Sequence, residues 1–509
     1  MWGLGVARER SSSRHALTLM IGTLGSRVSG LLREVLLVAL FTPANSDVFK
    51  IAWTVPNLFR ELLAEGALTN AFVPIYKELP EAERRRFSGA VASVLFLVNA
   101  LLLLLVIIIA PWIVDILLAQ KSYIDRELAI LVTRVIFPLL MTISFSALAM
   151  GILNSEERFL APAWAPAALN VVMIVAMFVF PKTAVWLALG AVLGGLAQFG
   201  VQLPALVRAG FFPRSSLWHP GLPLLLTLTT PFLFTTGARQ FLNVVAQRIV
   251  SDDTLFSAGA VTAYFIAGQL FGLVLGLFSI SPATAYYSRL SRDAVGGGSV
   301  RETLSQGARF IAFLCIPAGL LLWLFSEPVV SVLFQLRAAG QDNTLRLAIL
   351  ATAPLGLAVF PVGLNNFLLR PFFVRKRVRT PIIISVIFTL LNALFFTLLA
   401  PRLGIAGLSY AMALTGWLQL MVLLIFMRRD EGLELRNFML YSLKLFAAAC
   451  VSLLPAVFAA RWLGEFVGGW WGSVLELATG GVITLALYGL FAAWLGVPEL
   501  AALRRRLRR

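Results

Sequence analysis

The sequence is poor in the residues that build metal sites, disulfide frameworks and soluble surfaces. Its 509 residues include two cysteines and two histidines, and only 13% are charged. Soluble domains carry about 25% charged residues, which excludes water as the only solvent around this chain. Cys315 and Cys450 lie far apart in apolar segments and are interpreted as small buried hydrophobes. Because His15 and His219 are also isolated, no zinc-type site is expected.

Signatures of nucleotide hydrolysis and of enzymatic chemistry are also missing. No Gly-rich loop ends in a lysine as a Walker-type phosphate-binding loop does. No cluster of His, Asp and Glu suits general acid–base or metal-assisted catalysis. A transporter without a cofactor is therefore favoured over an enzyme. The expected energy source is the membrane potential, an ion gradient or consumption of the transported product.

Long apolar runs fill the chain from end to end. Hydrophobic residues make up 59% of it, and its mean hydropathy is +0.87. A helical span needs about 20 apolar residues, and fourteen spans are expected. Their bounds are about 15–40, 47–76, 88–119, 128–153, 162–181, 183–207, 222–251, 256–287, 308–334, 345–369, 381–400, 404–427, 438–460 and 470–495. The sequence therefore predicts an all-α integral membrane protein.

The distribution of Lys and Arg predicts the orientation of these spans. Of 42 such residues, 27 fall in one set of alternating loops and termini, and seven fall in the other. Cytoplasmic loops are the ones enriched in Lys and Arg, so both termini are expected on the cytoplasmic side. The basic tail 498–509 is expected to lie on anionic headgroups or to act as a simple topology anchor. Arg27 and Arg33 interrupt the first apolar run, which argues against a cleaved signal peptide.

Eight cations remain inside the expected spans. They are Arg27, Arg33, Lys50, Arg60, Arg134, Arg239, Arg248 and Lys444. Residues near span ends can reach the interface cheaply, which is one interpretation of Lys50, Arg248 and Lys444. Arg27, Arg60 and Arg239 fall near mid-depth, where a charge is costly and usually functional.

Two interpretations of the deep arginines stay open. In the first, they pair with buried acids, of which the first two spans offer four, namely Glu34, Asp47, Glu61 and Glu65. In the second, which we favour, they attract an anionic substrate, because guanidinium forks suit phosphate and diphosphate oxygens.

Helical spacing shows which residues of the first two spans share a face. Asn57, Arg60 and Glu61 share a face of the second span with Ala64. Gly22, Ser26 and Gly30 form a small-residue ridge on the first span, best explained by close helix packing.

A longer motif runs through the first two spans. It comprises Ser26-Arg27-Val28, Gly30, Arg33-Glu34, Asp47-Val48-Phe49, Val55-Pro56-Asn57-Leu58-Phe59-Arg60, Ala64-Glu65-Gly66-Ala67 and Asn70-Ala71-Phe72-Val73-Pro74. This segment resembles the N-terminal signature of the MurJ (MviN) lipid II flippase family. That family belongs to the multidrug/oligosaccharidyl-lipid/polysaccharide (MOP) exporter superfamily.

The resemblance implies a MATE-like architecture of two pseudo-symmetric six-helix lobes and two added C-terminal helices. On this chain the N-lobe would be 15–208 and the C-lobe 222–427. The last two spans, 438–497, would form a groove for a lipid tail.

The resemblance also implies roles for individual residues. Arg27, Arg33 and Arg60 would hold the substrate's diphosphate, and Asp47 and Glu65 would take part in gating. Asn57 is expected in the cavity. Lys50 lies where the family is usually apolar, and it is expected to pair with Asp47.

One departure concerns the eighth span. The family usually carries an acid and an arginine where this chain has Gly268 and Gln269. Gln269 would then be a cavity residue. Arg239 is our candidate for the missing cation, with Arg248 as the second choice.

Together these features favour a lipid II flippase that works by alternating access in the bacterial inner membrane. Lipid II would be its substrate, and the chain is expected to be a monomer, with cell-wall synthesis machinery as a further partner. The alternatives are a flippase for another polyprenyl-diphosphate glycan, such as an O-antigen or exopolysaccharide unit, and a cation-coupled multidrug exporter.

Overall fold

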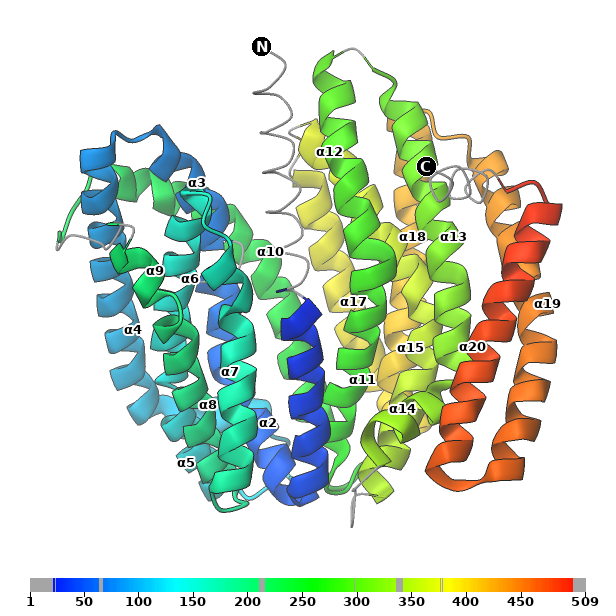
Figure 1. The fold of residues 1–509 in the computed structure, drawn as a ribbon, viewed down its shortest axis with the longest axis horizontal. Helices are drawn as coiled ribbons and strands as arrows, with labels where there is room; N and C mark the ends of the chain where they lie inside the picture. The colour runs from blue at the N-terminus through cyan, green and yellow to red at the C-terminus, as the bar shows by residue number, and fades with distance from the viewer. Residues whose placement is uncertain are drawn as a thin grey trace. The chain divides into compact units, whose positions relative to one another are not determined.

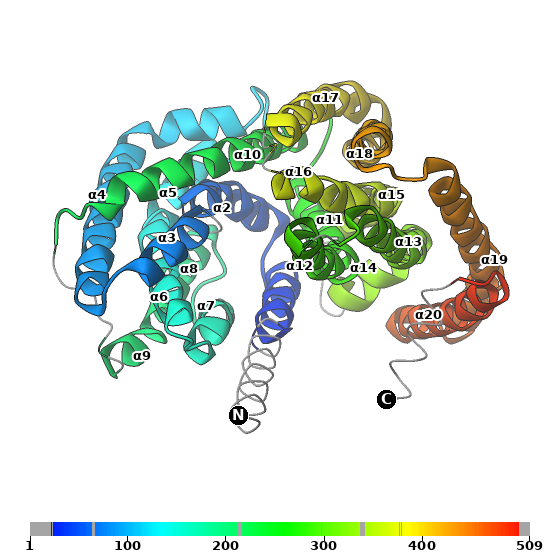
Figure 2. The ribbon, with the colours of Figure 1, turned by 90° about the horizontal axis from the view of Figure 1, so that it is seen from above.

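In the computed structural model, every element formed by the described residues is a helix. The structure describes residues 22, 24–63, 67–208, 210, 216–296, 298–335, 342–375, 377 and 379–497. The chain divides into two compact units, Met1–Asp252 and Asp253–Arg509. Figures 1 and 2 show the helices of both units.

The first unit is a helical bundle. Residues 24–40 form its first described helical segment. The following helices are α2 (Pro43–Leu63), α3 (Ala67–Glu78), α4 (Glu81–Leu117), α5 (Arg126–Ile136), α6 (Leu139–Ser155), α7 (Leu160–Val179), α8 (Ala184–Gly200), α9 (Leu203–Arg208) and α10 (Gly221–Val250). Stacked aromatic rings of Phe72, Tyr76 and Phe87 lie in its core.

The second unit contains the remaining helices. They are α11 (Ala260–Leu275), the π-helical turn η1 (Gly276–Ile280), α12 (Ser281–Gly296), α13 (Val300–Leu324), α14 (Ser326–Phe334), α15 (Asp342–Leu368), α16 (Arg370–Val374), α17 (Arg379–Leu403), α18 (Ile405–Glu431), α19 (Leu435–Val467) and α20 (Gly469–Trp494). Within this unit, α19 and α20 pack side by side along their length (Figures 1 and 2).

Local sequence explains several helix ends. Ser299 caps α13 by accepting a hydrogen bond from the backbone N–H of Glu302, in the Ser-x-x-Glu spacing of a capping box. Asp125 caps α5 in the same way through the N–H of Leu128. After α18, Gly432 adopts φ +67°, a left-handed conformation that glycine tolerates without strain.

Eleven helical stretches of the described residues are long and apolar enough to cross a membrane. The protein is therefore a multi-pass membrane protein, as its sequence predicts. The three other expected spans are 15–40, 47–76 and 222–251. These three spans carry six of the eight intramembrane cations, which lowers their hydropathy. The first two also include residues outside the described part of the chain. The count of fourteen stays a prediction.

The boundary between the two units falls after α10. This helix contacts α2, α3 and α4, which places it with the first unit. The second lobe was expected to begin earlier, at residue 222. The assignment of spans to two six-helix lobes, and of a lipid groove to 438–497, stays a prediction.

Candidate functional site: a cationic cluster on the first two helices

Four cations lie on the helical segment 24–40 and on α2. We call Arg27, Arg33, Lys50 and Arg60 the cationic cluster. Its members differ in exposure, because Arg27 is exposed, Arg33 and Arg60 are half-buried, and Lys50 is buried. The cluster has two parts, since Lys50 and Arg60 lie ten residues apart on α2, about 15 Å along the helix axis.

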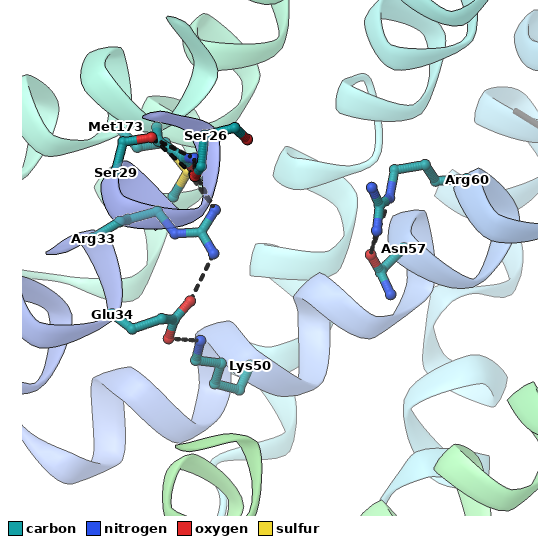
Figure 3. A network of polar contacts seen from close by, with 9 residues as sticks. Ser26, Ser29, Arg33, Glu34, Lys50, Asn57, Arg60 and Met173 are labelled. Carbon is teal, nitrogen blue, oxygen red and sulfur yellow. Dashed lines mark hydrogen bonds and ion pairs between the residues drawn. The ribbon is translucent and has the colours of Figure 1, made fainter. Parts of the chain in front are cut away.

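In the first part, one buried carboxylate holds two cations (Figure 3). The Glu34 Oε1 atom accepts a hydrogen bond of 2.7 Å from Arg33, and its Oε2 atom accepts one from the Lys50 ammonium. The side chains of Lys50 and Glu34 are only 4% and 7% exposed. Lys50 therefore does not reach an interface by snorkelling. Glu34 is an ion-pair partner of Lys50 that the sequence did not predict, and the expected pairing of Lys50 with Asp47 stays a prediction.

Arg33 is also held from its other side. Its guanidinium donates a 3.0 Å hydrogen bond to Asn170 Oδ1 on α7, and it lies 5.2 Å from the centroid of the Trp53 ring. Asn170 in turn donates to the backbone carbonyl of Ser26 and to the Ser29 hydroxyl. These contacts fix the direction of the guanidinium, because each uses a different part of its rigid fork.

The second part of the cluster is built on one face of α2. The Arg60 Nε and terminal nitrogen donate to Asn57 Oδ1 at 3.1 and 2.7 Å, and the Asn57 amide donates to Glu61 at 3.2 Å. Figure 3 shows the Arg60 side chain turned back along the helix onto Asn57. Gln240 on α10 donates to the other oxygen of Glu61. The shared face expected for Asn57, Arg60 and Glu61 is confirmed.

Asp47 is fully buried near the start of α2. Its Oδ2 atom accepts a 3.0 Å hydrogen bond from the Tyr123 hydroxyl, which lies 3.2 Å from the carbonyl oxygen of Val250 as well. Tyr123 belongs to the connection between α4 and α5. Asp47 therefore ties α2 to that connection and to the end of α10.

The other candidate residues lie apart from these contacts. Arg248 donates to the carbonyls of Asp115 and Ile116 at the end of α4, where the helix dipole favours a cation. That contact favours a structural role for this second-choice residue. Gln269 is exposed on α11 in the second unit.

Two candidates fall where the structure is not described. Glu65 lies outside the described residues. Arg239 lies on α10, but its side chain is outside the described part of the structure. Their roles stay predictions.

Several amide side chains that contact the cluster were not expected from the sequence. Gln240, Asn243 and Gln247 recur at i, i+3 and i+7 on α10, a spacing that places them on one helical face. Gln247 donates to Thr54 on α2, one turn from Lys50. Asn170 is a single amide within an apolar span. An amide side chain inside an apolar span is the sequence signal that could have predicted these contacts.

The arrangement favours anion binding over metal or acid–base chemistry. Glu34 and Asp47 are buried and partnered, while Arg27 is exposed and Arg33 and Arg60 are half-buried. Arg27 makes no hydrogen bond or ion pair with another described residue. No group of three His, Cys, Asp or Glu residues that could hold a metal occurs in the described part of the chain. The accessible donors are guanidinium forks, which match phosphate oxygens.

Comparison with known proteins decides the family. The family model described as lipid II flippase MurJ matches residues 37–477, most of the chain. The chain belongs to the lipid II flippase MurJ family. The probable lipid II flippase MurJ of Rhizobium tropici is 32% identical, over 97% of this chain and 96% of that protein. The lipid II flippase MurJ of Burkholderia cenocepacia is 31% identical, over 82% and 84%.

Solved structures agree on the MurJ fold. A lipid II flippase MurJ in an inward closed conformation matches with a TM-score of 0.79 and 22% identity, over 94% of this chain and 99% of that one. A multidrug resistance MATE family transporter of the MOP superfamily matches with a TM-score of 0.66 and 18% identity, over 81% and 96%. The expected MATE-like helical fold is confirmed.

Proposed function

We propose that this chain is a flippase that moves lipid II, the undecaprenyl-diphosphate-linked peptidoglycan precursor, from the cytoplasmic to the outer leaflet. It is a transporter and not an enzyme. The observation that carries the proposal is the cationic cluster on the first two helices of a chain that belongs to the MurJ family. Charges inside membrane spans are costly and are retained where they bind substrate or ions.

In this proposal Arg27 and Arg60 engage the substrate first. Arg27 and Arg60 offer guanidinium donors to the diphosphate, and Asn57 preorganises Arg60 by accepting two of its hydrogen bonds. Arg33 is already aimed by Asn170 and Glu34. A diphosphate that replaces the carboxylate as its partner would gain a bidentate contact.

The transport cycle that fits this arrangement is alternating access. The headgroup enters from the cytoplasmic side, and the polyprenyl tail stays in lipid beside 438–497. An inside-negative potential favours return of the empty, cationic site toward the cytoplasm, because each charge moved is worth about 2.3 kcal/mol per 100 mV. We propose the bacterial cytoplasmic membrane as its location, with both termini on the cytoplasmic side and a monomer as the working unit.

Complementation tests the proposal. The chain is expressed in bacteria depleted of their own lipid II flippase, and lipid II accessible on the outer leaflet is measured. We expect the wild-type chain to restore accessibility and Arg60→Ala to lose it by about tenfold or more, since a charged hydrogen bond contributes about 1.5–3 kcal/mol. Arg402→Ala is the matched control, because Arg402 is an exposed arginine at the end of α17 in the second unit.

A wild-type chain that reaches the membrane yet leaves lipid II inside would contradict the proposal. A second candidate would then lead, a flippase for another polyprenyl-diphosphate glycan. The observation that favours it is the exposed Gln269 where the family usually carries an arginine. An amide offers fewer donors and no charge to a diphosphate, so Gln269→Arg would then be the first variant to compare.

A further inference from the structure

Glu61 accepts hydrogen bonds from amide side chains at both of its carboxylate oxygens. Its Oε1 atom accepts one of 3.2 Å from the amide of Asn57, one turn earlier on α2. Its Oε2 atom accepts one of 2.5 Å from the amide of Gln240 on α10. Glu61 is half-buried and Gln240 is only 3% exposed. The carboxylate therefore joins α2 to α10 within the first unit.

The charge of Glu61 determines which way these two amides face. A side-chain amide has a donating NH2 group and an accepting carbonyl oxygen, and it keeps its shape when the two are exchanged by a half-turn. An ionised carboxylate has no donor and can only accept. Asn57 and Gln240 must therefore both turn their NH2 groups toward Glu61, which leaves their carbonyl oxygens facing other donors.

Each of these carbonyl oxygens accepts from the next residue of a chain. The Asn57 Oδ1 atom accepts two hydrogen bonds from Arg60, at 3.1 and 2.7 Å (Figure 3). The Gln240 Oε1 atom accepts one of 3.1 Å from Asn243. Two chains of donors, one from Arg60 and one from Asn243, thus end on the same carboxylate. Hydrogen bonds in such chains polarise and strengthen one another.

A neutral group at position 61 would not determine this arrangement. The amide of Glu61→Gln offers either its oxygen or its NH2 group to Asn57, so Asn57 becomes free to turn over. A reversed Asn57 would present its NH2 group to Arg60, whose guanidinium has donors only. Arg60 would then lose the acceptor that fixes its direction. The effect of the charge thus reaches Arg60 through Asn57.

We propose that Glu61 is a positioning residue for the diphosphate site. Its carboxylate orients Asn57, and Asn57 holds the Arg60 guanidinium in the direction in which it meets the substrate. This role rests on the proposed function. It differs from that of an acid that only neutralises Arg60, because the two roles predict opposite effects of removing the charge. Loss of a neutralising acid strengthens anion binding, and loss of an orienting acid weakens it.

The test uses the purified full-length chain in detergent, with undecaprenyl diphosphate as the probe and its dissociation constant as the readout. Glu61→Gln removes the charge and keeps the size of the side chain. We expect about fivefold weaker binding, the effect of losing one hydrogen bond. Glu156→Gln is the matched control, because it makes the same change in an acid that pairs with Arg84 instead. It should bind the probe as the wild type does.

An Arg60→Ala background separates positioning from other effects. When the guanidinium is absent, adding Glu61→Gln should cause no further loss of affinity, because there is nothing left for Glu61 to orient. Simple repulsion between Glu61 and the diphosphate would persist in this background, and so would a general loosening of the fold. Non-additivity of the two substitutions is therefore the result that the positioning role requires.

The direction of the Asn57 amide is tested without any substrate. Asn57→Asp places a second carboxylate against Glu61, and the repulsion of like charges should lower the apparent melting temperature. Adding Glu61→Gln should raise it again, since the new amide can donate to the new carboxylate. The same substitution should not raise the melting temperature of the wild-type chain. If it fails to rescue Asn57→Asp, the Asn57 amide does not donate to Glu61 and the proposal falls.

The binding results distinguish failure of this role from failure of the proposed function. Tighter binding by Glu61→Gln would show that Glu61 only neutralises Arg60. An equal loss in the Arg60→Ala background would show a general structural role. Either result overturns the positioning role and leaves the diphosphate site in place. If Arg60→Ala itself binds the probe as the wild type does, the proposed diphosphate site fails, and the positioning role fails with it.

Discussion

At the scale of single residues, Lys50 changes the net charge of the group that Glu34 forms with Arg33. A lone Glu34 beside Arg33 would neutralise one of the arginines expected to meet a diphosphate. The buried Lys50 ammonium shares that carboxylate, so the trio keeps one net positive charge. The shared carboxylate is the member that the trio cannot lose, because a buried Lys50 charge without Glu34 is strongly unfavourable.

A double-mutant cycle on this pair tests that argument. Glu34→Gln should destabilise the protein by about 3–5 kcal/mol, because it removes the carboxylate that the buried Lys50 ammonium contacts. Lys50→Met should cost less, because Glu34 keeps its ion pair with Arg33. The double variant should be less destabilised than Glu34→Gln alone, since the buried Lys50 charge is then absent. The measurement is the apparent melting temperature of purified protein in detergent. Additive losses would mean that the two side chains act independently.

At the scale of elements, a ridge of small residues brings the first helical segment against α7. An added Cβ atom at Gly22 would lie 2.5 Å from the Cβ of Ala163 and 2.7 Å from its carbonyl oxygen. At Gly30 it would meet the Asn170 amide at 3.4 Å. The packing interpretation of this ridge is confirmed. It also positions the site, because the same approach lets Asn170 reach both Ser26 and Arg33.

Gly22→Ala should therefore disturb the packing of the first helical segment against α7. The added methyl group would clash with the Ala163 backbone, which cannot move aside as a flexible side chain can. Overpacking of this kind costs about 1–3 kcal/mol. We expect a lower apparent melting temperature and weaker complementation. Gly481→Ala on α20 is the control, since its added Cβ meets nothing within 4 Å. If both variants melt alike, close packing at Gly22 is not what holds this segment to α7.

At the scale of the whole molecule, orientation rests on the uneven distribution of Lys and Arg among the loops. The turn between α6 and α7 contains Arg158, and the turn between α7 and α8 contains Lys182. They are separated by α7, a helix long and apolar enough to cross the membrane. The two exposed side chains are therefore expected on opposite sides.

Cysteine labelling in intact cells tests this topology. Native Cys315 and Cys450 are first replaced by alanine. Lys182→Cys should then react with a membrane-impermeant maleimide in intact cells, because its turn is expected to face outward. Arg158→Cys should react only after permeabilisation, which makes it the matched control. The opposite pattern would reverse the orientation and would place the entry side of the proposed flippase outside.

The sequence by itself determined the class of the molecule and the residues of its cationic cluster. Apolar runs of span length admit only helices in a bilayer, because each backbone polar group must find its partner within the segment. The motif from Ser26 to Pro74 marked Arg27, Arg33 and Arg60, and helical spacing placed Asn57 beside Arg60.

Only the tertiary structure decided the partners of these charges. Glu34 and Lys50 are sixteen residues apart, and Arg33 and Asn170 are 137 apart, so no local spacing predicts either contact. The contacts of Lys50 with Glu34, and of Asp47 with Tyr123, depend on which segments pack together. Composition and periodicity show which face of a helix is apolar, but they do not show which other helix covers it.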